Sequence, residues 1–188
     1  MKNRIQTGIA LCGIKHSGKS SVASALAEIL HWEFFDTDDF LAKLFADRTG
    51  RTLSVREIYR ELGETKFRLL EAEAVRRLPS GRNGGRIVAL GGGVLTNPNF
   101  TAEDRASLGF LCWLDTPDEV AYERILRNGL PPFLARETDP QAAFKKMNED
   151  RRIVFRENAD AAVRPEPEST PEETARKILR IYRERTAK

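Results

Sequence analysis

The apolar residues of this chain fall into five short runs, with longer stretches of helical spacing between and after them. Each run is almost continuously apolar, which favours strands buried on both faces over strands with one face in water. The runs that we expect to form strands are residues 7–12, 31–35, 87–90, 110–114 and 161–163.

The other stretches space their apolar residues every three or four positions, which predicts amphipathic helices. Ser54 and Glu57 form a capping box that starts the longest of them, and Gly63 interrupts it. Thr116-Pro117 is a second good helix start. The helices that we expect are residues 20–30, 40–45, 54–78, 117–127 and 142–155, and a last one that opens at Pro171.

Strands and helices therefore alternate along the chain, which is typical of a parallel sheet with helices on both faces. We predict a three-layer α/β/α fold with a five-stranded parallel sheet. The 188 residues of the chain fit one domain, so we take residues 1–188 as a single domain. In such folds ligands bind at the carboxyl ends of the strands.

Composition narrows the classes of function. The 31 basic residues nearly match the 28 acidic ones, and the net charge of +3 is too small to indicate a nucleic-acid partner. No run approaches transmembrane length and no signal peptide is evident, so we expect neither a membrane partner nor export. Cys12 and Cys112 lie in apolar runs without CxxC spacing, which indicates reduced core residues of a cytoplasmic protein.

The strongest chemical signal directly follows the first strand. Residues 13–20 read Gly-Ile-Lys-His-Ser-Gly-Lys-Ser, which is the GxxxxGKS pattern of a phosphate-binding P-loop between a strand and a helix. Backbone N–H groups of the loop and the helix N-terminus would hold a phosphate. Lys19 would reach the β- and γ-phosphates, and the Ser20 hydroxyl would ligate Mg²⁺. The pattern predicts a nucleotide-binding site.

Two further stretches follow the second and third strands. Asp36 and Asp38 alternate on extended chain, so one can face a metal while the other faces an acceptor hydroxyl. Alternatively, Thr37, Asp38 or Asp39 caps the next helix. Gly91-Gly92-Gly93 removes every side chain at the end of the third strand, so that backbone N–H groups can approach a substrate closely. A tight turn that needs positive φ is the alternative explanation.

Together these stretches resemble the shikimate kinases, within the nucleoside-monophosphate-kinase-like branch of P-loop NTPases. The resemblance covers nearly the whole chain. Besides the P-loop and Asp36-Thr37-Asp38, it rests on three further stretches. They are Gly63-Glu64 with Phe67-Arg68 and Glu71, the triplet 91–93, and residues 151–156 with Ala159-Asp160. It implies a sheet of strand order 2-3-1-4-5.

The resemblance also implies roles. Asp36 would assist the Mg²⁺, and Asp38 would bind and orient the attacking hydroxyl. Arg68 and Arg151 would hold the carboxylate of shikimate, although Arg152 and Arg156 leave the choice at 151 open and Arg68 could simply pair with Glu71. The full implied set is Gly13, Ser17, Gly18, Lys19, Ser20, Ser21 and Arg124 for ATP, with Arg124 against adenine, and Asp38, Arg68, Gly91, Gly92, Gly93 and Arg151 for the acceptor.

The chain departs from this family in two places. The lid, about residues 128–139, carries Pro131 where an arginine is usual, which leaves Arg127 or Arg136 to supply a cation to the γ-phosphate. His16 replaces a usual P-loop glycine, and we expect it to be an exposed loop residue. Residues 38–78 are expected to form the acceptor-binding helical region.

We therefore expect a monomeric, cytoplasmic kinase that uses ATP and Mg²⁺ to phosphorylate shikimate. Two alternatives remain open at this point. One is another small-metabolite kinase of the same branch, such as a gluconate kinase, because gluconate is also an acid. The other is a nucleotide-binding regulator with little turnover.

Overall fold

The computed structural model describes residues 8–81, 84–130, 134–166 and 168–187. Its centre is a five-stranded, all-parallel sheet of order β2-β3-β1-β4-β5, as expected. The strands are β1 (Gly8–Cys12), β2 (Glu33–Asp36), β3 (Arg86–Ala89), β4 (Phe110–Leu114) and β5 (Ala161–Val163). The first, third and fourth are buried throughout, and apart from Arg86 at the start of β3 they are continuously apolar.

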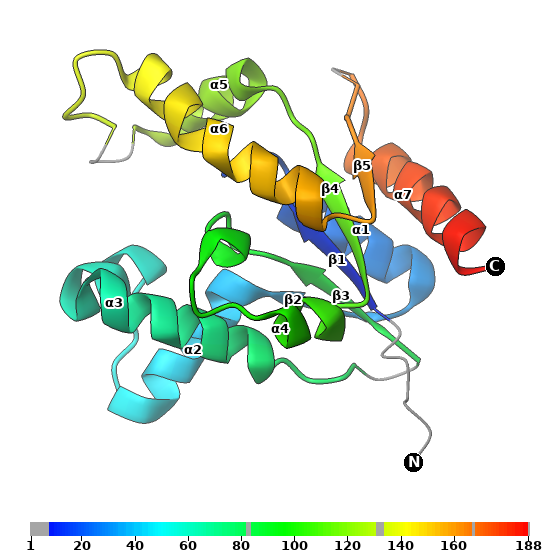
Figure 1. Cartoon of the computed structure of the whole chain (residues 1–188), viewed down its shortest axis with the longest axis horizontal. Coiled ribbons are helices and arrows are strands. Elements are labelled where there is room, and N and C mark those ends of the chain that lie inside the picture. The colour runs from blue at the N-terminus through cyan, green and yellow to red at the C-terminus, as the bar shows by residue number, and fades with distance from the viewer. Residues whose placement is uncertain (1–7, 82–83, 131–133, 167, 188) are drawn as a thin grey trace.

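Helices cover both faces of this sheet (Figure 1). They are α1 (Lys19–Leu30), α2 (Thr37–Thr49), α3 (Val55–Arg76), α4 (Ala102–Ser107), α5 (Asp118–Asn128), α6 (Pro140–Asn158) and α7 (Pro171–Thr186), with a 3₁₀ turn η1 at Val94–Thr96. One apolar core lies between the sheet and α1 with α7. A second lies between the opposite face and α5, α6 and the end of α3. A third joins α2 to α3 beyond the sheet edge.

Most expected elements are present, and the differences lie at their ends. Helix α2 begins at Thr37 rather than at residue 40, because the Asp36 side chain accepts a hydrogen bond from the Asp38 amide and caps it. Helix α6 begins at Pro140 because Asp139 caps it. Strand β2 starts two residues later than expected, since His31 ends α1 in a left-handed conformation.

The capping box of Ser54 and Glu57 is present at the start of α3, and Gly63 breaks that helix with φ 69° and ψ 170°. The elements η1 and α4 were not predicted. Both lie in the connection from β3 to β4, which places the triplet 91–93 against α3. Within the described ranges, no helix is both long and apolar enough to cross a membrane.

Candidate active site

The loop between β1 and α1 closes around its own lysine. Lys19 Nζ donates hydrogen bonds to the carbonyl oxygens of Gly13 (3.0 Å) and Ile14 (2.8 Å), and to Ser17 Oγ (3.3 Å). Burial lowers the pKa of Lys19 to about 8, so the ammonium is still mostly protonated near pH 7. Lys19 thus holds a cation inside the loop at the carboxyl end of β1.

Two side chains from outside the loop fix its backbone. The buried Thr116, after β4, donates from Oγ1 to the carbonyl oxygen of Ser17 (2.9 Å). Arg124 on α5 donates from Nη1 to the carbonyl oxygen of His16 (3.1 Å). A Cβ placed on Gly18 would lie 3.4 Å from the same Arg124 nitrogen. Arg124 therefore lies against the P-loop, and Thr116 is an anchor that the sequence analysis missed.

His16 has the backbone conformation that its position demands. Its φ is 61°, in the left-handed region where glycine is unstrained and other residues are not. Partial burial, followed by the charges of Lys15, Lys19 and Arg124, lowers the pKa of the His16 imidazole. The histidine is half-buried rather than exposed as expected, and it is held with positive φ.

A hydroxyl and a carboxylate meet beside the loop. Ser20 Oγ donates to Asp36 Oδ2 at 2.7 Å, while Asp36 Oδ1 accepts the Asp38 amide at 3.0 Å. Asp36 therefore caps α2, and not Thr37, Asp38 or Asp39 as the alternative explanation had it. Mg²⁺ takes oxygen ligands and is usually held by one or two protein groups together with phosphates and water. The pair fits that requirement, and the described residues contain no cluster of three His, Cys, Asp or Glu side chains that would form a larger metal cage.

The glycine triplet makes room for side chains. A Cβ on Gly91 would lie 2.5 Å from Asp38 Oδ1, and one on Gly93 would lie 2.7 Å from Arg68 Nη1. None of the three glycines has positive φ, so the tight-turn explanation is wrong. The Gly91 amide donates to Thr37 Oγ1 at 2.7 Å and is not available to a ligand. The triplet is therefore the surface against which Asp38 and Arg68 lie.

Asp38 is exposed as a residue, but its carboxylate lies against the glycine triplet and near other carboxylates. Burial, reinforced by the nearby carboxylates of Asp36 and Glu71, raises the pKa of Asp38 to about 6. The side chain still reaches solvent, and within the described part of the chain its carboxylate has no hydrogen-bond partner. Asp38 can therefore accept a proton from a ligand in a pH range where ordinary aspartates cannot.

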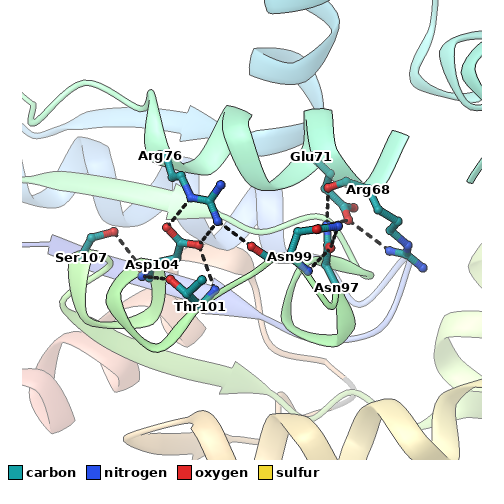
Figure 2. Close-up of polar contacts among 8 residues, drawn as sticks. All are labelled: Arg68, Glu71, Arg76, Asn97, Asn99, Thr101, Asp104 and Ser107. Carbon is teal, nitrogen blue, oxygen red and sulfur yellow. Dashed lines mark hydrogen bonds and ion pairs between the residues drawn. The ribbon is translucent and has the colours of Figure 1, made fainter. Parts of the chain in front are cut away.

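Arg68 on α3 is held from one side. Its Nη1 donates to Glu71 Oε2 (3.0 Å) and to the carbonyl oxygen of Gly93 (3.3 Å), while Nε lies 3.8 Å from the exposed Glu64. Figure 2 shows Arg68 reaching away from α3, with Glu71 and Asn97 behind it. The expected pairing with Glu71 is present, and it leaves part of the guanidinium fork open.

Arg151 and Arg152 are adjacent on α6 but have different surroundings. Arg152 forms ion pairs with Asp115 and Asp118, and it also donates to the Thr116 carbonyl oxygen at 2.7 Å. Arg151 has no hydrogen bond or ion pair to the described residues, and its Nη1 lies 3.8 Å from the position of a Cβ on Gly92. Burial and the charge of Arg68 lower the pKa of Arg151. Arg151 is thus the unpaired cation of the two.

The structure therefore brings most of the expected residues to one edge of the sheet. The exceptions lie at the end of α5 and in the segment after it. Pro131 is outside the described residues, Arg127 is exposed and 4.0 Å from Glu123, and Arg136 is exposed. Asn97 was missed, although the Asn-Pro that follows the glycine triplet is a turn signal.

Comparison with known proteins identifies the family of this chain. The family model described as Shikimate kinase matches residues 15–183, which is most of the chain. The chain belongs to the shikimate kinase family. Among its relatives, the shikimate kinase of Caldanaerobacter subterraneus subsp. tengcongensis is 33% identical over 93% of this chain and 95% of that protein.

Solved shikimate kinases share the fold. The enzyme from Acinetobacter baumannii in complex with shikimate superposes with a TM-score of 0.81 at 27% identity, covering 97% of this chain and 96% of that one. The enzyme from Aquifex aeolicus superposes with a TM-score of 0.66 at 28% identity, covering 96% of this chain and 99% of that one. The expected fold class and family are confirmed.

Proposed function

We propose that this shikimate kinase family member transfers the terminal phosphoryl group of ATP to the 3-hydroxyl of shikimate. The observation that carries the proposal is the convergence of Arg68 and Arg151 beside Gly92-Gly93, opposite Asp38 at Gly91. Two cations and one carboxylate at the end of β3 match an acceptor with a carboxylate at one end and hydroxyls at the other.

Arg68 and Arg151 would bind the carboxylate of the acceptor. A guanidinium offers its N–H groups in a planar fork that matches both oxygens of a carboxylate. Arg151 has no ion pair with the described residues, and burial, followed by the positive charge of Arg68, lowers its pKa. An acceptor carboxylate would relieve the repulsion between Arg151 and Arg68, so the site favours an anionic acceptor over a neutral one.

Asp38 would orient the attacking hydroxyl and take its proton. In the transfer, the oxygen–phosphorus bond to the acceptor forms as the bond to ADP breaks, and the hydroxyl proton passes to an Asp38 oxygen. With a pKa of about 6, Asp38 is mostly ionised at pH 7 and is a stronger base than an unperturbed aspartate.

The P-loop residues would bind the triphosphate. Lys19 would exchange its bonds to the loop carbonyl oxygens for bonds to phosphate oxygens, and Ser20 with Asp36 would hold Mg²⁺ between them and the phosphates. When bound, Mg²⁺ would neutralise charge on the β- and γ-phosphates. Arg124, which already lies against the loop, would contact the nucleotide, and Arg136 would reach it from the lid.

We also propose that the kinase works as a cytoplasmic monomer without nucleic-acid or membrane partners. The near balance of basic and acidic residues and two buried, free cysteines support this proposal. Size-exclusion chromatography with light scattering tests the oligomeric state.

An ADP-release assay coupled to NADH oxidation tests the proposed activity. Purified protein with Mg·ATP is offered shikimate, gluconate and nucleoside monophosphates in parallel. Turnover confined to shikimate is expected. Preference for gluconate would point to a different small-metabolite kinase, and ATP binding without turnover on any acceptor would point to a regulator.

Lys19→Ala separates the nucleotide site from the acceptor site. Because the buried ammonium at the β- and γ-phosphates disappears, kcat should fall by about 10³-fold or more while the far-UV circular dichroism spectrum stays unchanged. Arg180→Ala, at an exposed position on α7, is the control. Near-parental turnover by folded Lys19→Ala protein would contradict the assignment of the P-loop.

A further inference from the structure

Behind Arg68, the side-chain amide of Asn97 is fully used in hydrogen bonds. Its Nδ2 donates to Glu71 Oε2 (2.9 Å) and to the backbone carbonyl oxygen of Arg68 (2.7 Å). Its Oδ1 accepts from the Asn99 amide (2.9 Å) and from Asn99 Nδ2 (3.3 Å). Asn97 follows η1 and is 4% exposed, so these bonds form away from bulk water.

This pattern requires asparagine. Two acceptors, a carboxylate and a carbonyl oxygen, need two N–H donors on one nitrogen, while the backbone N–H of Asn99 needs an acceptor. The orientation of the amide follows from those neighbours. Aspartate has no donor and would add a second charge beside Glu71. Serine offers one donor on a shorter side chain.

The bond to Glu71 bears directly on Arg68. Glu71 is 5% exposed, and its Oε2 accepts from both Arg68 Nη1 and Asn97 Nδ2. Because the amide fixes that oxygen, the carboxylate engages Arg68 through Nη1 alone, and no hydrogen bond involves Nη2 within the described residues. Figure 2 shows Asn97 beside the Glu71 carboxylate to which Arg68 is bonded.

We propose that Asn97 is a positioning residue for the acceptor carboxylate. It holds Glu71 and the Arg68 backbone so that Arg68 keeps its free N–H groups directed to the acceptor instead of closing on Glu71. The proposal rests on the proposed function, since it takes the carboxylate of shikimate as the ligand of Arg68. It assigns specificity for the acceptor to a residue 29 positions from Arg68 along the chain.

The test compares Asn97→Ala and Asn97→Asp with the parent in steady-state kinetics at saturating Mg·ATP. We expect the KM for shikimate to rise about tenfold or more, while kcat and the KM for ATP change less than about twofold. Asn97→Ser keeps one donor and should give an intermediate KM. Asn99→Ala removes only the 3.3 Å side-chain bond and serves as the matched control, with kinetics like the parent.

A merely structural role is excluded by two further measurements. An analogue of shikimate that lacks the carboxylate should lose nothing more in Asn97→Ala than in the parent. In the Arg68→Lys background, Asn97→Ala should change the shikimate KM by less than about twofold. The reason is that Asn97 acts through the guanidinium group of Arg68, which Arg68→Lys has already removed. Equal losses with both acceptors, or additive losses in the double variant, would overturn the proposal even if Tm also fell.

The parent protein separates this inference from the function beneath it. If the parent turns over shikimate and Asn97→Ala leaves the shikimate KM unchanged, only the role of Asn97 is wrong. If the parent neither phosphorylates shikimate nor binds it by isothermal titration calorimetry, the proposed function and this inference are both wrong.

Discussion

Among the arginine–carboxylate pairs of helix α3, those of Arg68 and Arg76 use the same chemistry for different ends (Figure 2). In one pair, Arg76 donates from Nε and Nη2 to both oxygens of the buried Asp104, at 2.9 and 2.8 Å. Thr101 completes the set, because its amide donates to Asp104 Oδ2 at 2.9 Å within the capping box of α4. Every oxygen of that carboxylate is matched.

The other pair, nearer the glycine triplet, is left incomplete. Arg68 gives Glu71 one nitrogen only, and the neighbouring Arg151 has no ion pair with any described residue. Closed bidentate pairs hold elements together, whereas cations with free donors can bind a ligand. The comparison shows that an arginine's role depends on how much of its fork the protein itself occupies.

The carboxylates differ in the same way. Burial alone would raise the pKa of Asp104, but the hydrogen bonds from Arg76 and Thr101 outweigh burial and leave that pKa lowered. Asp38 lacks such partners, and burial raises its pKa to about 6. A fully paired carboxylate stabilises the fold, whereas a carboxylate with a raised pKa and no partner among the described residues is a candidate base.

The largest expected effect separates these two aspartates. Asp38→Asn should lower kcat by about 10²-fold or more, because the proton acceptor is lost, with ATP binding close to normal. Asp104→Asn should leave kcat within about twofold but lower the unfolding free energy by about 1–3 kcal/mol, because it weakens a buried charged pair and a cap. Steady-state kinetics measures kcat, and urea unfolding measures the unfolding free energy. If Asp38→Asn lost ATP affinity instead, the roles of Asp36 and Asp38 would be exchanged.

Whereas Asp104→Asn should destabilise the fold, Asp38→Asn should stabilise it at neutral pH. Because the folded-state pKa is about 6 and the ordinary value is 3.8, ionisation of this carboxyl lowers stability progressively as pH rises from about 4 to about 6, and the loss is complete above that range. Asp38→Asn should therefore have a higher Tm than the parent at pH 7.5, with the difference shrinking as pH falls toward 4. Differential scanning fluorimetry across this range provides the check.

Next in size is the exchange of the two arginines for lysine. Arg68→Lys keeps the charge and loses the fork, so the KM for shikimate should rise about tenfold or more while the KM for ATP changes little. Arg76→Lys loses the bidentate bond to Asp104 and should lower Tm with unchanged kinetics. Equal kinetic damage from both substitutions would mean that the closed and open pairs do not differ in function.

The pH profile of the parent tests the open carboxylate without mutation. As pH falls below about 6, Asp38 takes up a proton and can no longer act as base. The value of kcat/KM for shikimate should then fall about tenfold per pH unit, and the slope should disappear in Asp38→Asn. A flat profile between pH 5 and 7 would show that ionised Asp38 is not required.

A strained backbone conformation occurs both in the candidate active site and away from it. His16 in the P-loop and His31 at the end of α1 have φ of 61° and 54°. Replacing either by glycine should relieve the left-handed strain and stabilise the fold by about 0.5–1 kcal/mol, less the entropy that glycine adds to the unfolded chain. Lys15→Gly, at a residue without positive φ, should destabilise. Thermal unfolding distinguishes these outcomes, and a lower Tm for His16→Gly would mean that its side chain contributes more than strain.

The sequence by itself determined the features that depend on neighbours a few residues apart. Apolar runs of strand length, the GxxxxGKS loop and the Ser54–Glu57 capping box were all predicted and found. Their physics is local, because strand burial, phosphate loops and helix caps are set by residue types at short, regular spacing. The strand order followed only from resemblance to the shikimate kinases.

Tertiary structure decided which polar residues have partners. Asn97 meets Glu71 across 26 residues, and Thr116 meets Ser17 across 99, which no periodicity in the sequence reveals. Arg151 and Arg152 are indistinguishable in sequence, yet α6 directs one toward Gly92 and the other toward Asp115. A free donor or a shifted pKa depends on what the folded chain places beside a group, so the chemistry of this site emerges only when distant segments meet.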